Sequence, residues 1–546
     1  MFKTIKSGLA ALGLFVAALA TAAPAHAEWL RAETDHFIVY GDWSEASIRR
    51  YAQRIERYDA LLRTYYPVST ENEIPKLEIY LADGGRDMNR VSPGISGSVA
   101  GYYSPNSGRI YAVVNRGAMS GDVVMFHEYA HHFMFQMGAN AYPSWFVEGF
   151  AEYYATADVQ EGDLELGRHH PGRMNALNIG FNSWAKMEDV LTWRISRTGR
   201  APIFLYYAQS WAMAHYFMSD PERTRMLGRY LNAVKQGQPS VEAMQAATGR
   251  TPAQLQDDVW RYMSGRITLL TPQIELPVPD VTVTRLSRAE ADTIWLDIRL
   301  DTMPITQEKF DNDGQREVRA SEIAKYEREQ AEEREELIRS SMTMAERLGD
   351  DRIGALLAAR AHRINHRPDL ALEVLLPRLD DSSTDGDMLR VAANALLDQA
   401  KAETDPQAAA NLRRRASGFL ARSMDADPLD FRVYVGLNDT RRGQARYPTD
   451  NDISTLEVAN ALAPQSFEVR LRLGEAYIAR NLYGEAIQTL TPVSNSPHRS
   501  AYTRRAREMI NQAHTALGQA TEDFGESPSD QEETPTEPAA AASGAR

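Results

Sequence analysis

The chain has 546 residues, no cysteine, and 74 acidic against 60 basic side chains, which gives a formal net charge of −14 at pH 7. Without cysteine it forms no disulfides, and any metal must be held by histidine, carboxylate or water. The negative balance argues against general nucleic-acid binding. A chain of this length is expected to form two or three domains.

Residues 1–27 have the pattern of a secretory signal peptide. Lys3 and Lys6 form a basic start, residues 9–20 are an apolar run, and Ala25-His26-Ala27 is a small-x-small cleavage site. The apolar run is too short to span a bilayer, and no later segment approaches that length. We therefore expect an exported protein, periplasmic in a bacterium, with no transmembrane segment in the mature chain.

The mature N-terminus, up to about residue 117, predicts a mixture of strands and helix. The strands are indicated by runs rich in aromatic and β-branched residues, and the helix by apolar residues on one stripe. The last two strands flank a Pro-Asn-Ser-Gly turn, which predicts a hairpin. The predicted strands are 36–40, 77–81, 98–103 and 109–114, and the predicted helix is 45–65.

Residues 121 to about 138 predict a helix that carries the sequence His127-Glu128-Tyr129-Ala130-His131. Two imidazoles four residues apart share one helix face, so both can bind one zinc ion, and Glu128 can reach a water at the metal. The helix is apolar almost all round, so it is expected to be buried, and buried polar side chains need partners. His132 points off the ligand face. A chance match with core histidines is the alternative.

A second helix is predicted after Pro143, with Ser144 as its N-cap. Glu148 and Glu152 share one face of this helix because they are four residues apart. Glu148 is the expected third zinc ligand, and Glu152 is expected to accept the free N–H of a ligating histidine. Apolar neighbours argue against the alternative that Glu148 is a solvated surface acid. Together the two helices predict a zinc-dependent hydrolase and favour a peptidase.

The HExxH motif at 127–131 and the Trp-Phe-x-Glu-Gly-Phe-Ala segment at 145–151 resemble those of gluzincin metallopeptidases. They are particularly similar to aminopeptidase N and to the peptidase-MA-like bacterial proteins. The resemblance covers about residues 30–265 and implies an α+β catalytic domain, with an N-terminal sheet that has an edge strand and a helical C-terminal part. Carried over to this chain, the zinc ligands are His127, His131 and Glu148, and the general base is Glu128.

This family also uses a tyrosine on a later helix, in a Tyr-x-x-small sequence, to stabilise the oxyanion. Here Tyr207-Ala208-Gln209-Ser210 stands about sixty residues beyond Glu148, so the resemblance implies that Tyr207 is this donor. Tyr206 and His215 are the next candidates. A structural role in an aromatic core is the alternative for Tyr207.

One departure from the family concerns recognition of the substrate's amino terminus. Aminopeptidases of the family carry a Gly-x-Met-Glu-Asn signature upstream of the zinc helix, and its glutamate grips the free amino group. This chain has Gly97-Ser98-Val99-Ala100-Gly101 in that region, without an acid. An edge strand that pairs with an extended peptide needs no such acid. We therefore expect endopeptidase rather than aminopeptidase action.

The segment after the second helix carries weaker signals. His169-His170 precede Pro171-Gly172, and this turn chemistry favours a solvated loop over a position at the border of the cleft. A helix that starts at Thr251-Pro252 is expected to close the catalytic domain, which the sequence places at 28–268.

The rest of the chain predicts a connector and a charged, solvated helix at 269–348, helical repeats at 349–516 and a disordered acidic tail at 517–546. The repeats resemble the tetratricopeptide pattern, and their concave face is a candidate site for a protein partner. An ordinary helical bundle is the alternative. The residues that carry the pattern are Leu473, Gly474, Tyr477, Ala486 and Leu490, then Ala416, Leu420 and Pro428, and then Ala359, His362 and Ala371.

The sequence thus predicts an exported zinc metallopeptidase that takes a peptide or protein substrate. The alternative is a non-catalytic helical-repeat scaffold with a zinc-binding pseudo-peptidase domain. Glu128 beside both histidines favours the enzyme, because a purely structural zinc site needs no general base. The ligand set is also compatible with a zinc hydrolase that acts on a non-peptide bond.

Overall fold

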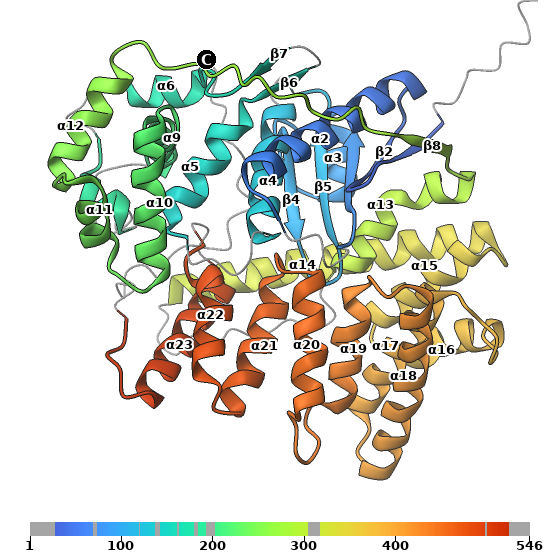
Figure 1. Cartoon of the computed structure of the whole chain (residues 1–546). Helices are drawn as coiled ribbons and strands as arrows, with labels where there is room; N and C mark the ends of the chain where they lie inside the picture. Colours follow the sequence, from blue (N-terminus) through green and yellow to red (C-terminus); the bar gives the residue numbers. More distant parts are fainter. Residues whose placement is uncertain are drawn as a thin grey trace, which may run out of the picture.

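The computed structural model describes residues 28–68, 74–118, 121–136, 142–160, 163–178, 184–192, 203–303, 317–496 and 500–522. The predicted signal peptide and most of the predicted acidic tail lie outside these ranges. The chain is mixed α/β, with an N-terminal sheet and a helical C-terminal part (Figure 1). Among the helices that the structure describes, none is long and apolar enough to cross a membrane.

A six-stranded sheet in the order β4-β5-β3-β2-β1-β8 forms the centre of the N-terminal part. β2, β3 and β5 are parallel, and β4, β1 and β8 each run antiparallel to their neighbours. The predicted strands, helix and hairpin are confirmed, and β4 lies at one edge. The strands are β1 (Leu30–Glu33), β2 (Phe37–Gly41), β3 (Leu77–Ala82), β4 (Gly101–Pro105), β5 (Ile110–Asn115) and β8 (Thr282–Arg285).

Helices cover both faces of this sheet. Because side chains alternate along a strand, Ile79 faces one core and its neighbour Tyr80 faces the other. The core on the Ile79 side includes α2 (Glu45–Tyr65) and α4 (Gly121–Gln136), and the other includes α3 (Gly85–Val91) and α13 (Arg288–Thr302). The sheet therefore backs the helix that carries the HExxH motif.

The sheet unit extends past residue 268, where the sequence placed the end of the catalytic domain. β8 pairs with β1 as the other edge strand, and α13 packs Ile294, Trp295 and Ile298 on the sheet. Most of the segment that was expected to be a connector is thus part of the sheet unit. The helix α14 (Glu317–Leu348), which was expected to be solvated, is buried on one side, because Leu337 is fully buried in a core with α13.

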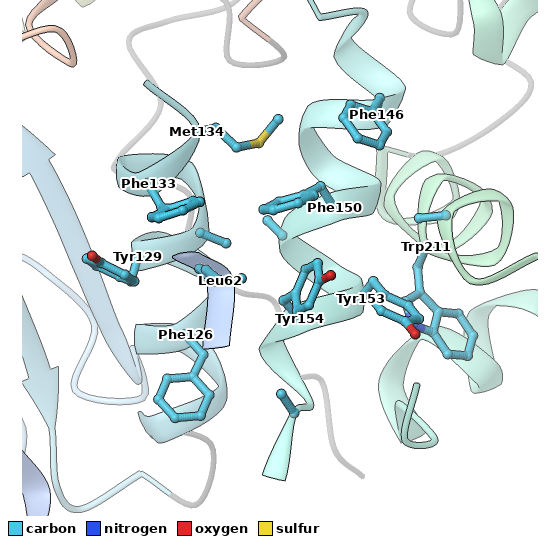
Figure 2. Close-up of a cluster of buried hydrophobic side chains, with 14 of the residues drawn as sticks. Leu62, Phe126, Tyr129, Phe133, Met134, Phe146, Phe150, Tyr153, Tyr154 and Trp211 are labelled. Atoms are coloured by element: carbon cyan, nitrogen blue, oxygen red, sulfur yellow. The ribbon is translucent and has the colours of Figure 1, made fainter. Parts of the chain in front are cut away.

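A group of helices stands beside the sheet, and α5 lies between α4 and α9 within it. Figure 2 shows large aromatic side chains of α4 and α5, such as Phe133 and Phe150, turned toward one another, with Trp211 of α9 on the far side of α5. Packed aromatic rings hold the three helices in fixed relative positions. The helices are α5 (Ser144–Ala155), α6 (Pro171–Leu177), α7 (Met187–Leu191), α9 (Ile203–Met218), α10 (Pro221–Lys235), α11 (Ser240–Thr248) and α12 (Pro252–Met263), with the strand pair β6 (Asp158–Gln160) and β7 (Asp163–Glu165).

The C-terminal helices pack on their neighbours in chain order and form a row below the sheet unit (Figure 1). Where α21 meets α22, a Cβ on Gly474 would lie 2.8 Å from the Leu490 side chain, so only glycine permits this approach. The helices are α15 (Arg352–Ile364), α16 (Pro368–Leu375), α17 (Gly386–Ala402), α18 (Pro406–Ala426), α19 (Phe431–Arg441), α20 (Asp450–Leu462), α21 (Phe467–Ala479), α22 (Tyr483–Ser494) and α23 (Ala501–Ala516).

This helical row contacts the end of α4. Gln465, between α20 and α21, has its Nε2 3.4 Å from Nε2 of His132, and the rings of Phe467 and Phe135 meet edge to face at 6.2 Å. Burial lowers the pKa of His132 to about 3, with a smaller contribution from the charge of Arg63, so this ring is neutral. The side of the row that faces α4 is thus used within the chain, and a protein partner would need another face.

The row also contacts the start of α5, where one expectation needs correction. Ser144 is the first residue of α5 and does not cap it, because Pro143 occupies the N-cap position. The Ser144 hydroxyl instead donates to the carbonyl oxygen of Asn495 at 2.7 Å, and the Asn495 amide donates to the Tyr142 carbonyl at 3.2 Å. A contact between distant segments has replaced the local cap.

Candidate metal centre

Three ligand atoms meet between α4 and α5. Nε2 of His127 and Nε2 of His131 are 3.1 Å apart, and Oε2 of Glu148 lies 3.5 Å from the first and 3.7 Å from the second. The two histidines project from one face of α4 because they are four residues apart, and α5 brings Glu148 opposite them. The structure therefore brings together the three residues that the sequence predicts as ligands.

The spacing of these three atoms fits one zinc ion. In a tetrahedral zinc site with nitrogen and oxygen ligands, the ligand atoms lie about 3.3 Å from one another. The three measured separations fall on both sides of this value. The Glu148 side chain is fully buried, whereas those of His127 and His131 are 18% and 13% exposed, so the open side of the site is the histidine side.

Glu128 lies on α4 between the two histidines. Burial raises the pKa of Glu128 to about 7; the positive charge of His131 opposes this rise, and the negative charges of Glu148 and Glu152 add to it. A carboxyl group with a pKa near neutral can both accept and release a proton at neutral pH. A dication bound by the neighbouring ligands would lower this pKa and favour the carboxylate.

Glu152 lies behind His127, as the sequence predicts. Its Oε1 is 3.5 Å from Nδ1 of His127, the ring nitrogen that faces away from the other ligands. The same carboxylate contacts Nη2 of Arg173 at 2.5 Å and Nε2 of His170 at 3.4 Å. His170 is therefore half-buried at the site and not in a solvated loop. Its charged partner comes from α5, which turn chemistry alone could not reveal.

Tyr207 on α9 lies next to Arg173, which contacts Glu152. Burial raises the pKa of the Tyr207 hydroxyl, and the negative charge of Glu148 adds to this rise. The guanidinium of Arg173 lies over the Tyr207 ring, 5.4 Å from its centre. Tyr207 is half-buried, whereas Tyr206 is fully buried, so Tyr207 is the better placed of the two.

The remaining candidate, His215, has a structural role. Its Nε2 lies 3.0 Å from the carbonyl oxygen of Gly167, and its Nδ1 lies 2.8 Å from the hydroxyl of Tyr262. The ring is fully buried. With both nitrogens engaged in this way, His215 is removed from the candidates for oxyanion stabilisation.

Edge strand β4 passes close to α4. The hydroxyl of Tyr103 on β4 lies 2.9 Å from Nδ1 of His132. Burial raises the pKa of Tyr103, and the negative charge of Glu128 adds to this rise. Within the described part of the chain β4 pairs with β5 only, which leaves its second edge without a strand partner.

A second group with metal-ligand chemistry, formed by His36, Glu56 and Asp59, is an ion-pair network. Nδ1 of His36 lies 2.5 Å from Glu56 and 3.3 Å from Asp59. Asp59 also accepts from Arg63 at 2.6 Å and from the Tyr129 hydroxyl at 2.5 Å. These donors already occupy the carboxylates, so the group needs no ion.

This network predicts a pH dependence of stability. Burial alone would lower the pKa of His36, but the hydrogen bond to Glu56 and the charge of Asp59 outweigh it and raise the pKa. The stabilisation by His36 is therefore complete below about pH 6.5 and is lost as the pH rises through the folded-state pKa. We expect wild type to lose up to about 1 kcal/mol of unfolding free energy over this rise, and His36→Gln to lose less. Urea unfolding from pH 5.5 to 8.5 measures this; parallel curves for the two proteins would contradict it.

A family model described as a protein of unknown function, DUF1570, matches residues 123–240, from the first turn of α4 to the start of α11. The matched segment contains α4 and α5, the two helices of the candidate metal centre, and also Tyr207. No curated protein matches the chain.

Proposed function

We propose that this protein is a zinc metallopeptidase of the gluzincin type. The observation that carries the proposal is the approach of His127, His131 and Glu148 at zinc-ligand spacing, with Glu128 on the same helix. Three protein ligands leave a position for water or substrate, which is typical of catalytic rather than structural zinc sites. The burial of Glu148 supports a site that excludes bulk water on one side.

The proposed roles follow from the positions of the side chains. Zinc held by the three ligands would supply Lewis-acid chemistry and lower the pKa of water. Glu128 accepts the proton of the attacking water and passes it to the leaving amine. Tyr207 donates a hydrogen bond to the oxyanion that develops on the peptide carbonyl.

An extended peptide is the proposed substrate, and endopeptidase action the proposed mode. The second edge of β4 offers backbone hydrogen-bonding groups beside α4. The approach to β4, residues 97–101, carries no acid that would hold a free amino terminus. Export to the periplasm, by a signal peptide at residues 1–27, is part of the same proposal.

For the C-terminal helices we propose a tetratricopeptide-like stack. Helices that pack on their chain neighbours, with Gly474 and Ala486 buried between α21 and α22, support it. The proposed contribution of the stack is to hold α4 and α5 in place, because it contacts both helices. Since its face toward α4 is occupied, a partner would bind to another face of the stack.

The test is metal removal from the purified protein. We expect about one zinc ion per chain, cleavage of unfolded proteins, loss of cleavage with a zinc chelator and recovery when Zn²⁺ is added back. Peptide fragments identified by mass spectrometry will distinguish internal from terminal cleavage. Stoichiometric zinc without cleavage of any peptide in a diverse library would favour the scaffold, and absence of bound zinc would reject the site.

Removal of the Tyr207 hydroxyl should lower turnover more than binding. We expect Tyr207→Phe to reduce kcat by about 10²–10³-fold with a small change in KM, because the donor acts on the oxyanion and not on the ground state. Steady-state kinetics on one peptide will measure this. Tyr216→Phe, on the same helix, is the control; equal activity of both variants would return Tyr207 to a structural role.

A further inference from the structure

We propose that Arg173 is a positioning residue for the metal centre: it holds Glu152 against His127 and holds the ring of Tyr207 at the same time. The proposal rests on the zinc site described above. It concerns α5, which carries Glu148 and Glu152, and α6, which carries Arg173.

The first observation is that both oxygens of the Glu152 carboxylate are engaged. Oε1 lies 2.5 Å from Nη2 of Arg173 and 3.5 Å from Nδ1 of His127, and Oε2 lies 3.4 Å from Nε2 of His170. The Glu152 side chain is only 2% exposed. A buried carboxylate requires such partners, and each contact restricts the direction in which the carboxylate faces His127.

The second observation is that the start of α6 fixes Arg173. His170 is the N-cap of this helix, and its Nδ1 accepts from the backbone N–H of Arg173 at 3.4 Å. Pro171 at the first helical position makes this start rigid. The His170 ring therefore contacts the Arg173 backbone through one nitrogen and Glu152 through the other, so the three residues form one unit.

The third observation is the position of the guanidinium over Tyr207, 5.4 Å from the ring centre. A planar guanidinium can bind a carboxylate and lie on an aromatic face together, which a lysine ammonium does less well. Arg173 thus connects Glu152, behind one zinc ligand, with the proposed oxyanion donor. A carboxylate held beside Nδ1 of His127 keeps the proton of the imidazole on Nδ1. The other nitrogen, Nε2, is then free of a proton and can bind the metal.

The experiment measures metal binding by the full-length protein, independently of turnover. Arg173→Gln is expected to weaken zinc binding by about 10–100-fold in a chelator competition and to alter the visible absorption of the Co²⁺-loaded protein. Arg173→Lys keeps the charge but loses the planar guanidinium, so its zinc affinity is expected to lie between those of Arg173→Gln and wild type. Arg173→Gln added to Glu152→Gln should cost less than about twofold more, because both act through one contact.

Arg168→Gln is the matched control. Arg168 lies five residues earlier in the chain, and the substitution breaks an ion pair of the same length, 2.5 Å, with Asp158 in place of Glu152. Wild-type zinc affinity and an unchanged Co²⁺ spectrum in Arg173→Gln would overturn the proposal, as would fully additive losses in the double variant or a wild type that binds no metal.

If Arg173→Gln fails to fold, a zinc affinity of Arg173→Lys equal to that of Glu152→Gln would also overturn it. A wild type that binds zinc and follows the expected order, yet cleaves no peptide, would reject the peptidase and leave the role of Arg173 intact.

Discussion

Glu128→Gln is expected to reduce kcat by about 10²–10⁴-fold while the protein still binds one zinc ion. The substitution keeps the size of the side chain and removes its ability to accept a proton. None of the three zinc ligands is changed, so metal affinity should stay within a few-fold of wild type. Turnover of a fluorogenic peptide, together with metal analysis of the same sample, will measure both quantities.

The control for Glu128→Gln is Glu222→Gln, an exposed acid on α10 of the same unit. It should leave both turnover and zinc content unchanged. Retained activity of Glu128→Gln would show that another group takes the proton. Loss of zinc from it would show that Glu128 contributes to metal binding and not only to proton transfer.

Gly149→Ala is expected to damage both stability and the metal centre. A Cβ at this position would lie 2.5 Å from the carbonyl oxygen of Ser210 and 3.1 Å from Cβ of Ala214, so α5 and α9 would have to separate. Glu148 is the neighbouring residue on α5, and Tyr207 lies on α9. We expect a loss of about 3 kcal/mol in the free energy of unfolding. We also expect weaker zinc binding, because the Glu148 ligand moves with α5.

Urea unfolding of the metal-free protein and zinc competition will test Gly149→Ala. Gly228→Ala is the matched control, because Gly228 lies inside α10 and an added Cβ there meets no atom within 4 Å. Alanine at that position should stabilise the helix by up to about 1 kcal/mol. If both alanine variants are equally stable, the close approach of α5 and α9 is not required.

The agreement between the predicted ligand residues and the side chains that meet between α4 and α5 has a local cause. Two histidines four residues apart must share a helix face, so the sequence alone placed His127 and His131 together, with Glu128 between them. Glu148 needed one further inference, that the helix after Pro143 packs against the first helix. The apolar residues around Glu148 indicated that this acid is buried, and the family resemblance implied that it is the third ligand.

Contacts between distant segments were beyond such reasoning. Nothing in the short, polar β8 shows that it pairs with β1, and α13 becomes part of the sheet unit only through that pairing. Ser144 has the chemistry of a helix cap, yet a carbonyl from the end of α22 binds its hydroxyl. In both cases the deciding partner lies hundreds of residues away in the chain.

Local sequence patterns were enough to predict the candidate ligand residues, the helices that carry them and most of the strands behind them, because periodicity and motif spacing act within a few residues. Packing between distant segments places Arg173 and His170 on Glu152, engages both ring nitrogens of His215 and brings the C-terminal helices against α4 and α5. A buried charge or ring nitrogen takes whichever partner the packed chain brings within hydrogen-bonding distance. That partner is set by the fold and not by neighbours in the sequence.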